Sequence, residues 1–106
     1  MSIQKISDIK TIDVNAKEWF DKVNGNSYFS CRVTLNYGME NETTILIPFQ
    51  YGYGNMYEQA TAKELVKRGL FPANSSLWRV CGDNSITRRT NILTKCLKRD
   101  VLAWGK

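Results

Sequence analysis

The side chains that most often perform chemistry are scarce in this chain of 106 residues, and histidine is absent from it. Without histidine, the Ser-His-Asp and Cys-His nucleophile systems, the His-containing zinc sites and the commonest general base are all excluded. The three cysteines, Cys31, Cys81 and Cys96, are widely spaced and form no C-x-x-C pair. Their odd number and their spacing favour neither a metal site nor a disulfide framework.

Carboxylates remain as candidates for acid–base chemistry, and Asp13, Glu18 and Asp21 lie around one aromatic pair. On a helix Glu18 and Asp21 would share a face, whereas on a strand they would point to opposite faces. Lys17 and Lys22 lie directly beside them, which is typical of a solvated charge pattern. We therefore predict that the protein is not an enzyme and that it uses no cofactor and no metal.

The segment Tyr51-Gly52-Tyr53-Gly54 superficially resembles a glycine-rich phosphate loop. It lacks both the G-K-[ST] ending and the G-x-G-x-x-G spacing. Glu58 would also occupy the first turn of the following helix, where its charge satisfies the helix end that a phosphate would otherwise use. We favour a structural interpretation, in which the glycines allow a tight turn and the tyrosines cover the edge of a sheet.

Charge is distributed unevenly along the chain, whose formal net charge is +5. Residues 1–58 carry five Lys or Arg against seven Asp or Glu, and residues 59–106 carry ten against three. This asymmetry indicates either an ordinary solvated basic surface or an anionic partner. The residues expected to meet the phosphates of a nucleic acid or an acidic protein are Arg88, Arg89, Lys95, Lys98 and Arg99.

Aromatic side chains supply the second half of the binding argument. Exposed tyrosines could stack on bases, but aromatic and basic residues do not interleave within one stretch, and a small core needs most of its aromatics. An exposed edge strand at 43–49 suits recognition of a protein by strand addition or by charge, with homodimerisation as one version. The residues expected to contact a protein partner are Tyr51, Tyr53, Tyr57 and Arg32.

Strict alternation of side chains organises the middle of the chain. In residues 27–37 the odd-numbered positions from Phe29 to Tyr37 form one face and the even-numbered positions the other, which predicts a strand with a dry and a wet side. Residues 38–42 supply a polar turn, and residues 43–49 return as a second strand. Pro48 cannot donate a ladder hydrogen bond, so this second strand is expected at an edge of the sheet.

Residues 14–23 fit two structures. Asn15 followed by Glu18 resembles a helix N-cap with its capping box, and Gly25 could end such a helix. Alternatively, the second half of the segment is a strand, and Asn24-Gly25, the strongest hairpin dipeptide, turns it into the next strand. We favour the strand, because the immediate turn gives an economical three-stranded meander.

The clearest helix is predicted from Met56 to Arg68, where Ala62, Leu65 and Val66 share one side. Charged residues share the other side, and Gly69 would end the helix. Its expected role is to cover the sheet.

Two later segments complete the predicted elements. Residues 77–81 have the composition of a short apolar strand. In residues 86–101 a helical spacing of three and four competes with the alternation of β-branched residues. We favour the helix there, with a strand leading into one short helical turn as the alternative.

These elements predict a single α+β domain over residues 1–106: an antiparallel sheet of three or four strands, one main helix packed on it, and a basic C-terminal segment. No apolar run approaches the ~20 residues of a membrane span. The start, MSIQKISDIK, lacks the apolar region of a signal peptide. We therefore expect a cytoplasmic protein without a membrane partner.

Two segments resemble a known group of proteins. Residues 19–28 (WFDKVNGNSY) and 48–54 (PFQYGYG) resemble the W-F-x-[KR]-x-[YN]-G-N-[ST]-Y and F-x-Y-G-Y-G segments of small, uncharacterised phage and prophage accessory proteins. The resemblance covers roughly residues 11–66, with a weaker likeness at 98–101. Members of that group often carry a histidine where this chain has Phe29, so any role of that histidine is lost here.

The resemblance implies a viral accessory protein that acts in the cytoplasm of the host cell. Such proteins often bind and block or redirect a host complex, anti-CRISPR proteins being the familiar example. Many of those are acidic, whereas this chain is basic, which disfavours a simple DNA mimic and leaves binding to an acidic surface of a nuclease or to its guide RNA.

We therefore predict a non-enzymatic binding protein that inhibits or modulates a host protein or ribonucleoprotein complex, with CRISPR and other defence complexes as candidate targets. One alternative is nucleic-acid binding through the basic C-terminal half. A second alternative is a minor structural or assembly role in the virus.

Overall fold

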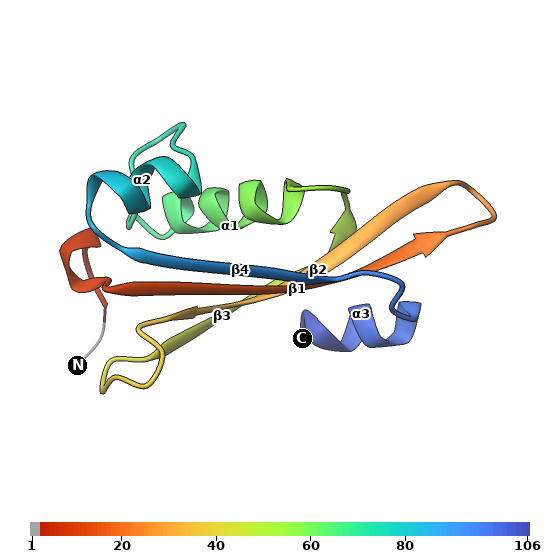
Figure 1. Cartoon of the computed structure of the whole chain (residues 1–106), viewed down its shortest axis with the longest axis horizontal. Coiled ribbons are helices and arrows are strands. Elements are labelled where there is room, and N and C mark those ends of the chain that lie inside the picture. Colours follow the sequence, from red (N-terminus) through yellow and green to blue (C-terminus); the bar gives the residue numbers. More distant parts are fainter. Residues whose placement is uncertain (1–2) are drawn as a thin grey trace.

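Four strands form one mixed sheet in the computed structural model, which describes residues 3–106 (Figure 1). The strands are β1 (Thr11–Asp21), β2 (Asn26–Leu35), β3 (Thr43–Tyr51) and β4 (Thr87–Leu93), in the order β3-β2-β1-β4. The helices are α1 (Met56–Lys67), α2 (Leu77–Asp83) and α3 (Lys98–Trp104), with a 3-10 turn at Ile6–Asp8. α1 and α2 cover one side of the sheet, the core face, and α3 lies on the opposite side, the open face (Figure 1).

The first three strands form the predicted antiparallel meander. Val14 of β1 lies opposite Val33 of β2, and Cys31 of β2 lies opposite Ile47 of β3. The strand interpretation is thus confirmed for residues 17–21, but the two-residue turn predicted at Asn24-Gly25 is wrong, because β1 ends at Asp21 and residues 22–25 form a four-residue turn. The Asp21 carboxylate accepts hydrogen bonds from the N–H groups of Val23 and Asn24 in this turn, and Gly25 has a φ of +70°, a conformation that glycine adopts at little cost. β3 lies at an edge of the sheet, as its proline predicts.

β4 runs parallel to β1, from Thr87 opposite Thr11 to Leu93 opposite Lys17. Parallel neighbours need a crossover connection, which α1 and α2 supply on the core face. The sheet is therefore mixed rather than wholly antiparallel. The predicted α+β class, with a four-stranded sheet and one main helix packed on it, is confirmed.

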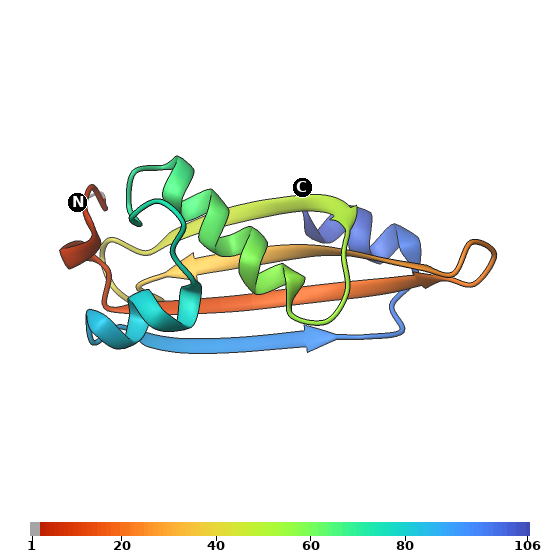
Figure 2. The same ribbon diagram turned by 90° about the horizontal axis from the view of Figure 1, so that it is seen from above.

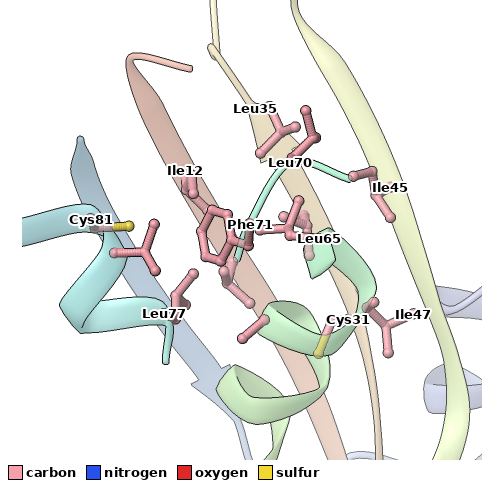
Figure 3. Close-up of a cluster of buried hydrophobic side chains, with 14 of the residues drawn as sticks. Ile12, Cys31, Leu35, Ile45, Ile47, Leu65, Leu70, Phe71, Leu77 and Cys81 are labelled. Atoms are coloured by element: carbon pink, nitrogen blue, oxygen red, sulfur yellow. The ribbon is translucent and has the colours of Figure 1, made fainter. Parts of the chain in front are cut away.

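The core lies between the sheet and α1. Alternate residues of the strands point to the core face, and α1 contributes Tyr57, Thr61, Ala62 and Leu65. Figure 3 shows Leu65 and Phe71 among side chains of the sheet that include Ile12 and Ile45. The predicted helix is confirmed, and Gly69 follows its end at a φ of +77°. Among the residues so described, none of the helices has the length and apolar character needed to cross a bilayer.

The strand predicted at 77–81 is wrong, because these residues begin the helix α2. Leu77, Val80 and Cys81 are all buried, whereas Trp78 and Arg79 are exposed. This is the i, i+3, i+4 stripe of a helix that lies on an apolar surface. In a strand alternate residues share a face, so Arg79 would have been buried together with Leu77 and Cys81.

The continuous helix favoured for residues 86–101 is also wrong, and the alternative is correct: β4 leads into the short helix α3. Pairing with β1 explains the difference. The open edge of β1 provides ladder hydrogen bonds along the whole of β4, and such non-local pairing overrides local helical spacing.

The alternation predicted for residues 27–37 ends before Asn36. Asn36 was expected on the wet face, yet it is completely buried, and Tyr37 was expected on the dry face, yet it is 68% exposed. The cause is a backbone φ of +56° at Asn36, which interrupts the strand geometry.

Asn36 joins three separate segments through its side chain. Its oxygen accepts hydrogen bonds from the backbone N–H groups of Lys10 and Thr11 at 2.6 and 3.2 Å. Its nitrogen donates to the carbonyl of Asp8 at 2.8 Å and to the side-chain oxygen of Asn41 at 3.0 Å. The amide therefore ties the start of β1 to the end of β2 and to the turn before β3.

Replacing Asn36 with alanine should lower the free energy of unfolding by about 2–4 kcal/mol, because buried backbone groups lose their partners and alanine must hold a positive φ. Urea unfolding followed by circular dichroism measures this change. Asn41→Ala removes only one of the four bonds and should cost less than about 1.5 kcal/mol. Equal losses in the two variants would contradict this role of Asn36.

Candidate binding surface

Five aromatic residues at the hairpin end of the sheet are in ring contact and are here called the aromatic row: Trp19, Tyr28 and Phe49 contact one another, and Tyr51 and Tyr53 extend this cluster from Tyr28. The rings of Trp19 and Tyr28 are stacked with their centroids 5.6 Å apart, and those of Tyr28 and Phe49 are stacked at 5.2 Å with an angle of only 8°. Tyr51 then meets Tyr28 edge-on at 5.9 Å, and Tyr53 meets Tyr51 edge-on at 6.3 Å. Contacts of this kind stabilise one another beyond simple burial.

Strand pairing positions the inner members of the row. Trp19 lies directly opposite Tyr28, and Tyr28 lies opposite Tyr51. The β2–β3 register shifts between Phe29 and Cys31, so β3 contains an additional residue there. This bulge brings Phe49 beside Tyr28, since a bulge re-aims the side chains that follow it.

The inner rings form a compact cluster, which limits the ring surface left for a ligand. Trp19, Tyr28 and Phe49 all contact one another, with the centroids of Trp19 and Phe49 6.4 Å apart, and the Nζ of Lys98 lies 5.4 Å from the centre of the Trp19 ring. The outer members, Tyr51 and Tyr53, are 52% and 61% exposed. A partner therefore meets two tyrosines that are held from behind by a packed aromatic array.

α3 covers the open face beside the row and is held there by Trp104. The indole Nε1 donates a 2.8 Å hydrogen bond to the carbonyl of Asn15 in β1, and the carbonyl of Trp104 accepts one of 3.0 Å from Arg32 in β2. The charged groups of Lys17 and Arg32 lie 4.4 and 4.0 Å from the centre of the indole. Cation–π contacts of this length are favourable, most of all with tryptophan.

The end of α3 fits closely against the sheet. The hydroxyl of Ser30 donates to the carbonyl of Val101, whose side chain is completely buried. A Cβ on Gly105 would lie 2.8 Å from the carbonyl oxygen of Ile47 and 2.9 Å from the Cβ of Ser30. Only glycine fits at this approach of two backbones.

A hollow of about 870 Å³ opens at the other end of the row. It lies between the hairpin end of β1 and residues 94–97, and its walls include Trp19, Phe20, Lys95, Cys96 and Leu97. Phe20 and Leu97 are each about half exposed. The hollow could therefore accept an apolar side chain of a partner, and the charged groups that line it are of both signs: Glu18, Asp21, Lys22 and Lys95.

The four residues predicted to contact a protein partner have different surroundings. Tyr51 and Tyr53 are exposed in the aromatic row, as that role requires. Tyr57 is only 7% exposed, because its position on α1 faces the sheet, so its side chain belongs to the core rather than to a surface. Arg32 is half-buried and engaged by Trp104.

The five predicted basic residues do not form one patch. Arg88 and Arg89 are neighbours on a strand and point to opposite faces: Arg88 pairs with Glu58 of α1 at 2.9 Å, and Arg89 pairs with Asp13 of β1 at 3.0 Å. Both charges are thus largely compensated within the chain. The three exposed residues that follow β4 are Lys95, Lys98 and Arg99, of which the first two lie beside Trp19.

Sequence patterns alone did not identify Trp19, Phe49 and Trp104 as parts of this surface. A two-residue turn at Asn24-Gly25 would have placed Tyr28 opposite Asp21, so the pair of Trp19 with Tyr28 depends on the longer turn that the structure shows. The contribution of Phe49 depends on a bulge, and that of Trp104 on contacts with strands far away in the chain. Neither leaves a local signal in the sequence.

The cysteines differ in their surroundings. Burial raises the pKa of the Cys31 thiol to about 12 and that of Cys81 to about 11, the latter against an opposing effect of the Arg88 charge. Cys96 is only partly buried, and its Sγ lies 3.3 Å from the carbonyl of Leu93. Within residues 3–106, no three His, Cys, Asp or Glu side chains gather into a group that could hold a metal ion.

Comparison of the chain with protein-family models, with characterised proteins and with solved structures finds no match. Any function assigned to this chain must therefore be consistent with the geometry of this surface.

Replacing Trp104 with alanine should release α3 from the open face and lower the free energy of unfolding by about 2 kcal/mol, since buried contacts and cation–π interactions are lost. Urea unfolding measures the loss. Trp78→Ala is the matched control, because this indole is 64% exposed and its removal should change stability by less than about 0.5 kcal/mol. Similar losses from both variants would show that Trp104 does not hold α3.

The thiol of Cys96 should react quickly with a disulfide reagent at pH 8. The thiols of Cys31 and Cys81 should react at least about tenfold more slowly, because the thiolate is the nucleophile and their raised pKa values keep them protonated. Cys96→Ser should abolish the fast phase. The folded pKa values of the other two thiols lie above that of an unfolded thiol, about 8.5. Their contribution to stability is therefore fully present below that pH and decreases as the pH rises towards 11. Two fast thiols at pH 8 would contradict this assignment.

Proposed function

We propose that this protein is a non-enzymatic binding protein that recognises another protein through the exposed end of its aromatic row. The observation that carries the proposal is the exposure of Tyr51 and Tyr53 on a packed array of rings. Tyrosine is enriched among the residues that dominate interface energies, because it combines a large contact area with few rotatable bonds. A tyrosine held by its neighbours loses still less conformational entropy on binding.

Charged side chains beside the row would help to select the partner. Lys98 lies against Trp19, and the adjoining hollow is lined by Lys22 and Lys95 together with Glu18 and Asp21. Charges at the rim of an interface accelerate association and select the partner more than they add affinity. The partner that fits this surface is therefore a protein patch with an apolar group at its centre and charged groups of both signs around it.

The proposed target is a complex of a bacterial host that a phage accessory protein inhibits or modulates, with defence nucleases, including CRISPR complexes, among the candidates. This part of the proposal rests on the resemblance of residues 19–28 and 48–54 to phage and prophage proteins. It is consistent with the site, because the second of these segments contributes both exposed tyrosines and the first contributes Trp19 and Tyr28.

Direct binding of a nucleic acid is the second candidate, and the exposed residues Lys95, Lys98 and Arg99 favour it. Two observations weigh against it. Arg88 and Arg89 are already paired with carboxylates, and the inner rings of the row pack against one another, which reduces the ring surface on which a base could stack.

Affinity capture with the tagged protein from a lysate of the host, with and without nuclease, tests the proposal when it is combined with matched variants. We expect a stoichiometric protein partner that survives nuclease treatment. The double variant Tyr51→Ser/Tyr53→Ser should weaken its binding about tenfold or more. Tyr37→Ser is the control, because Tyr37 is 68% exposed but lies outside the row.

Three outcomes would contradict the proposal. Equal binding by the double variant and by the control would exclude the aromatic row as the contact surface. Recovery of nucleic acid alone, lost on nuclease treatment or at moderate salt, would favour the second candidate. Dependence on Arg88 and Arg89 rather than on the tyrosines would do the same.

A further inference from the structure

The two edges of the sheet differ in their ability to pair with another strand. β3 contains Pro48, which has no N–H group, and its register with β2 is shifted beside that residue. The tight approach of Gly105 to Ile47 and Pro48 adds further obstruction. Homodimerisation through residues 43–49, the version expected from the sequence, is therefore disfavoured by the structure of that edge.

β4 presents the opposite case. It pairs with β1 without interruption over seven residues, contains no proline or glycine, and is exposed at every position except Ile92, which is partly buried. Figure 2 shows β4, in blue, as the outermost strand on its side of the sheet. An uncovered regular edge of this kind is a template for a further strand.

The direction of the free backbone groups follows from the pairing. The N–H of Thr87 donates to the carbonyl of Lys10 at 3.0 Å, so the odd-numbered residues of β4 turn their backbone groups towards β1. Alternate residues of a strand turn these groups to opposite sides. The residues whose N–H and C=O groups point outward are therefore Arg88, Thr90 and Ile92.

The arginines of β4 do not prevent strand pairing at this edge. Charged side chains on an edge strand usually discourage pairing. Here the side chain of Arg88 lies on the core face, where it pairs with Glu58, and the side chain of Arg89 lies on the open face, where it pairs with Asp13. Both positive charges are compensated by groups of the same chain.

We propose that two copies of this chain pair through β4, antiparallel and about a two-fold axis at Thr90, to form a continuous eight-stranded sheet. In this register Thr90 lies opposite Thr90 of the second copy, and Arg88 lies opposite Ile92. On the open face Arg89 lies opposite Asn91. No arginine opposes an arginine, the outward groups give about six hydrogen bonds, and a threonine pair is favourable at the centre.

This arrangement goes beyond the proposed function and does not depend on it. The edge formed by β3, where Tyr51 lies, is on the far side of each sheet from β4. A dimer would therefore present two exposed aromatic rows and could bind two copies of a partner with increased avidity. Because a short strand pair buries less surface than a standard stable interface, we expect dissociation in the micromolar range.

Sedimentation equilibrium over about 5–500 µM tests the proposal, with circular dichroism to confirm folding. We expect the wild type to form dimers, and Thr90→Lys should weaken them about fivefold or more, since it places like charges directly opposite one another. Thr44→Lys, the same exposed substitution on the β3 edge, is the matched control and should leave the dimer unchanged. Mixing Thr90→Lys with Thr90→Glu should restore association as a heterodimer.

The mixing experiment is decisive because only an axis at position 90 brings the two substituted residues together. A wild type that stays monomeric at every concentration would overturn the proposal. This holds even if β4 then accepts a strand of a different protein. A dimer weakened by Thr44→Lys rather than Thr90→Lys would place the interface on β3. Failure of the mixed variants to associate while the wild type dimerises would exclude the proposed register.

Discussion

The length of the central hairpin is the constraint on which the rest of the structure depends. β1 and β2 pair along their whole length, but β4 pairs only with residues 11–17 of β1. The hairpin therefore extends beyond its neighbour on that side. Its end carries Trp19 and Tyr28. Their apolar rings pack against one another and against Phe49, and not against a helix. The candidate surface is thus a consequence of a sheet that extends past its core.

The two faces of the sheet are covered by different kinds of interaction. On the core face, aliphatic residues of the strands meet Leu65, Phe71 and other apolar groups, as in most small α+β domains. On the open face, α3 is held by the indole of Trp104, which contacts the charged groups of Lys17 and Arg32, by hydrogen bonds and by the buried Val101. A helix of seven residues is not stable in isolation, so these directional contacts hold α3 in place.

The edges of the sheet show a similar division. A proline and a bulge interrupt β3, whereas β4 is regular and its charged side chains are paired with carboxylates of the same chain. Such features decide whether an edge strand can pair with another strand. The irregular β3 edge therefore lies beside the surface proposed for another protein, and the regular β4 edge is the one proposed for a second copy. The two interactions would not compete for the same residues.

The sequence by itself determined the elements that rest on local patterns. Alternation in β2, the hairpin between β1 and β2, the edge position of Pro48 and the helix α1 were all predictable, because each depends on residues near one another in the chain. The length of the hairpin turn was not, since Asn24-Gly25 alone predicts two residues and the structure has four. The nature of 77–81 and 86–101 was decided by tertiary contacts: Arg79 could stay exposed only on a helix, and β4 exists because β1 offers it a partner. The same holds for the surface. Exposed tyrosines were foreseeable, whereas the burial of Tyr57, the pairing of Arg88 and Arg89, and the role of Trp104 arise from groups brought together only by folding.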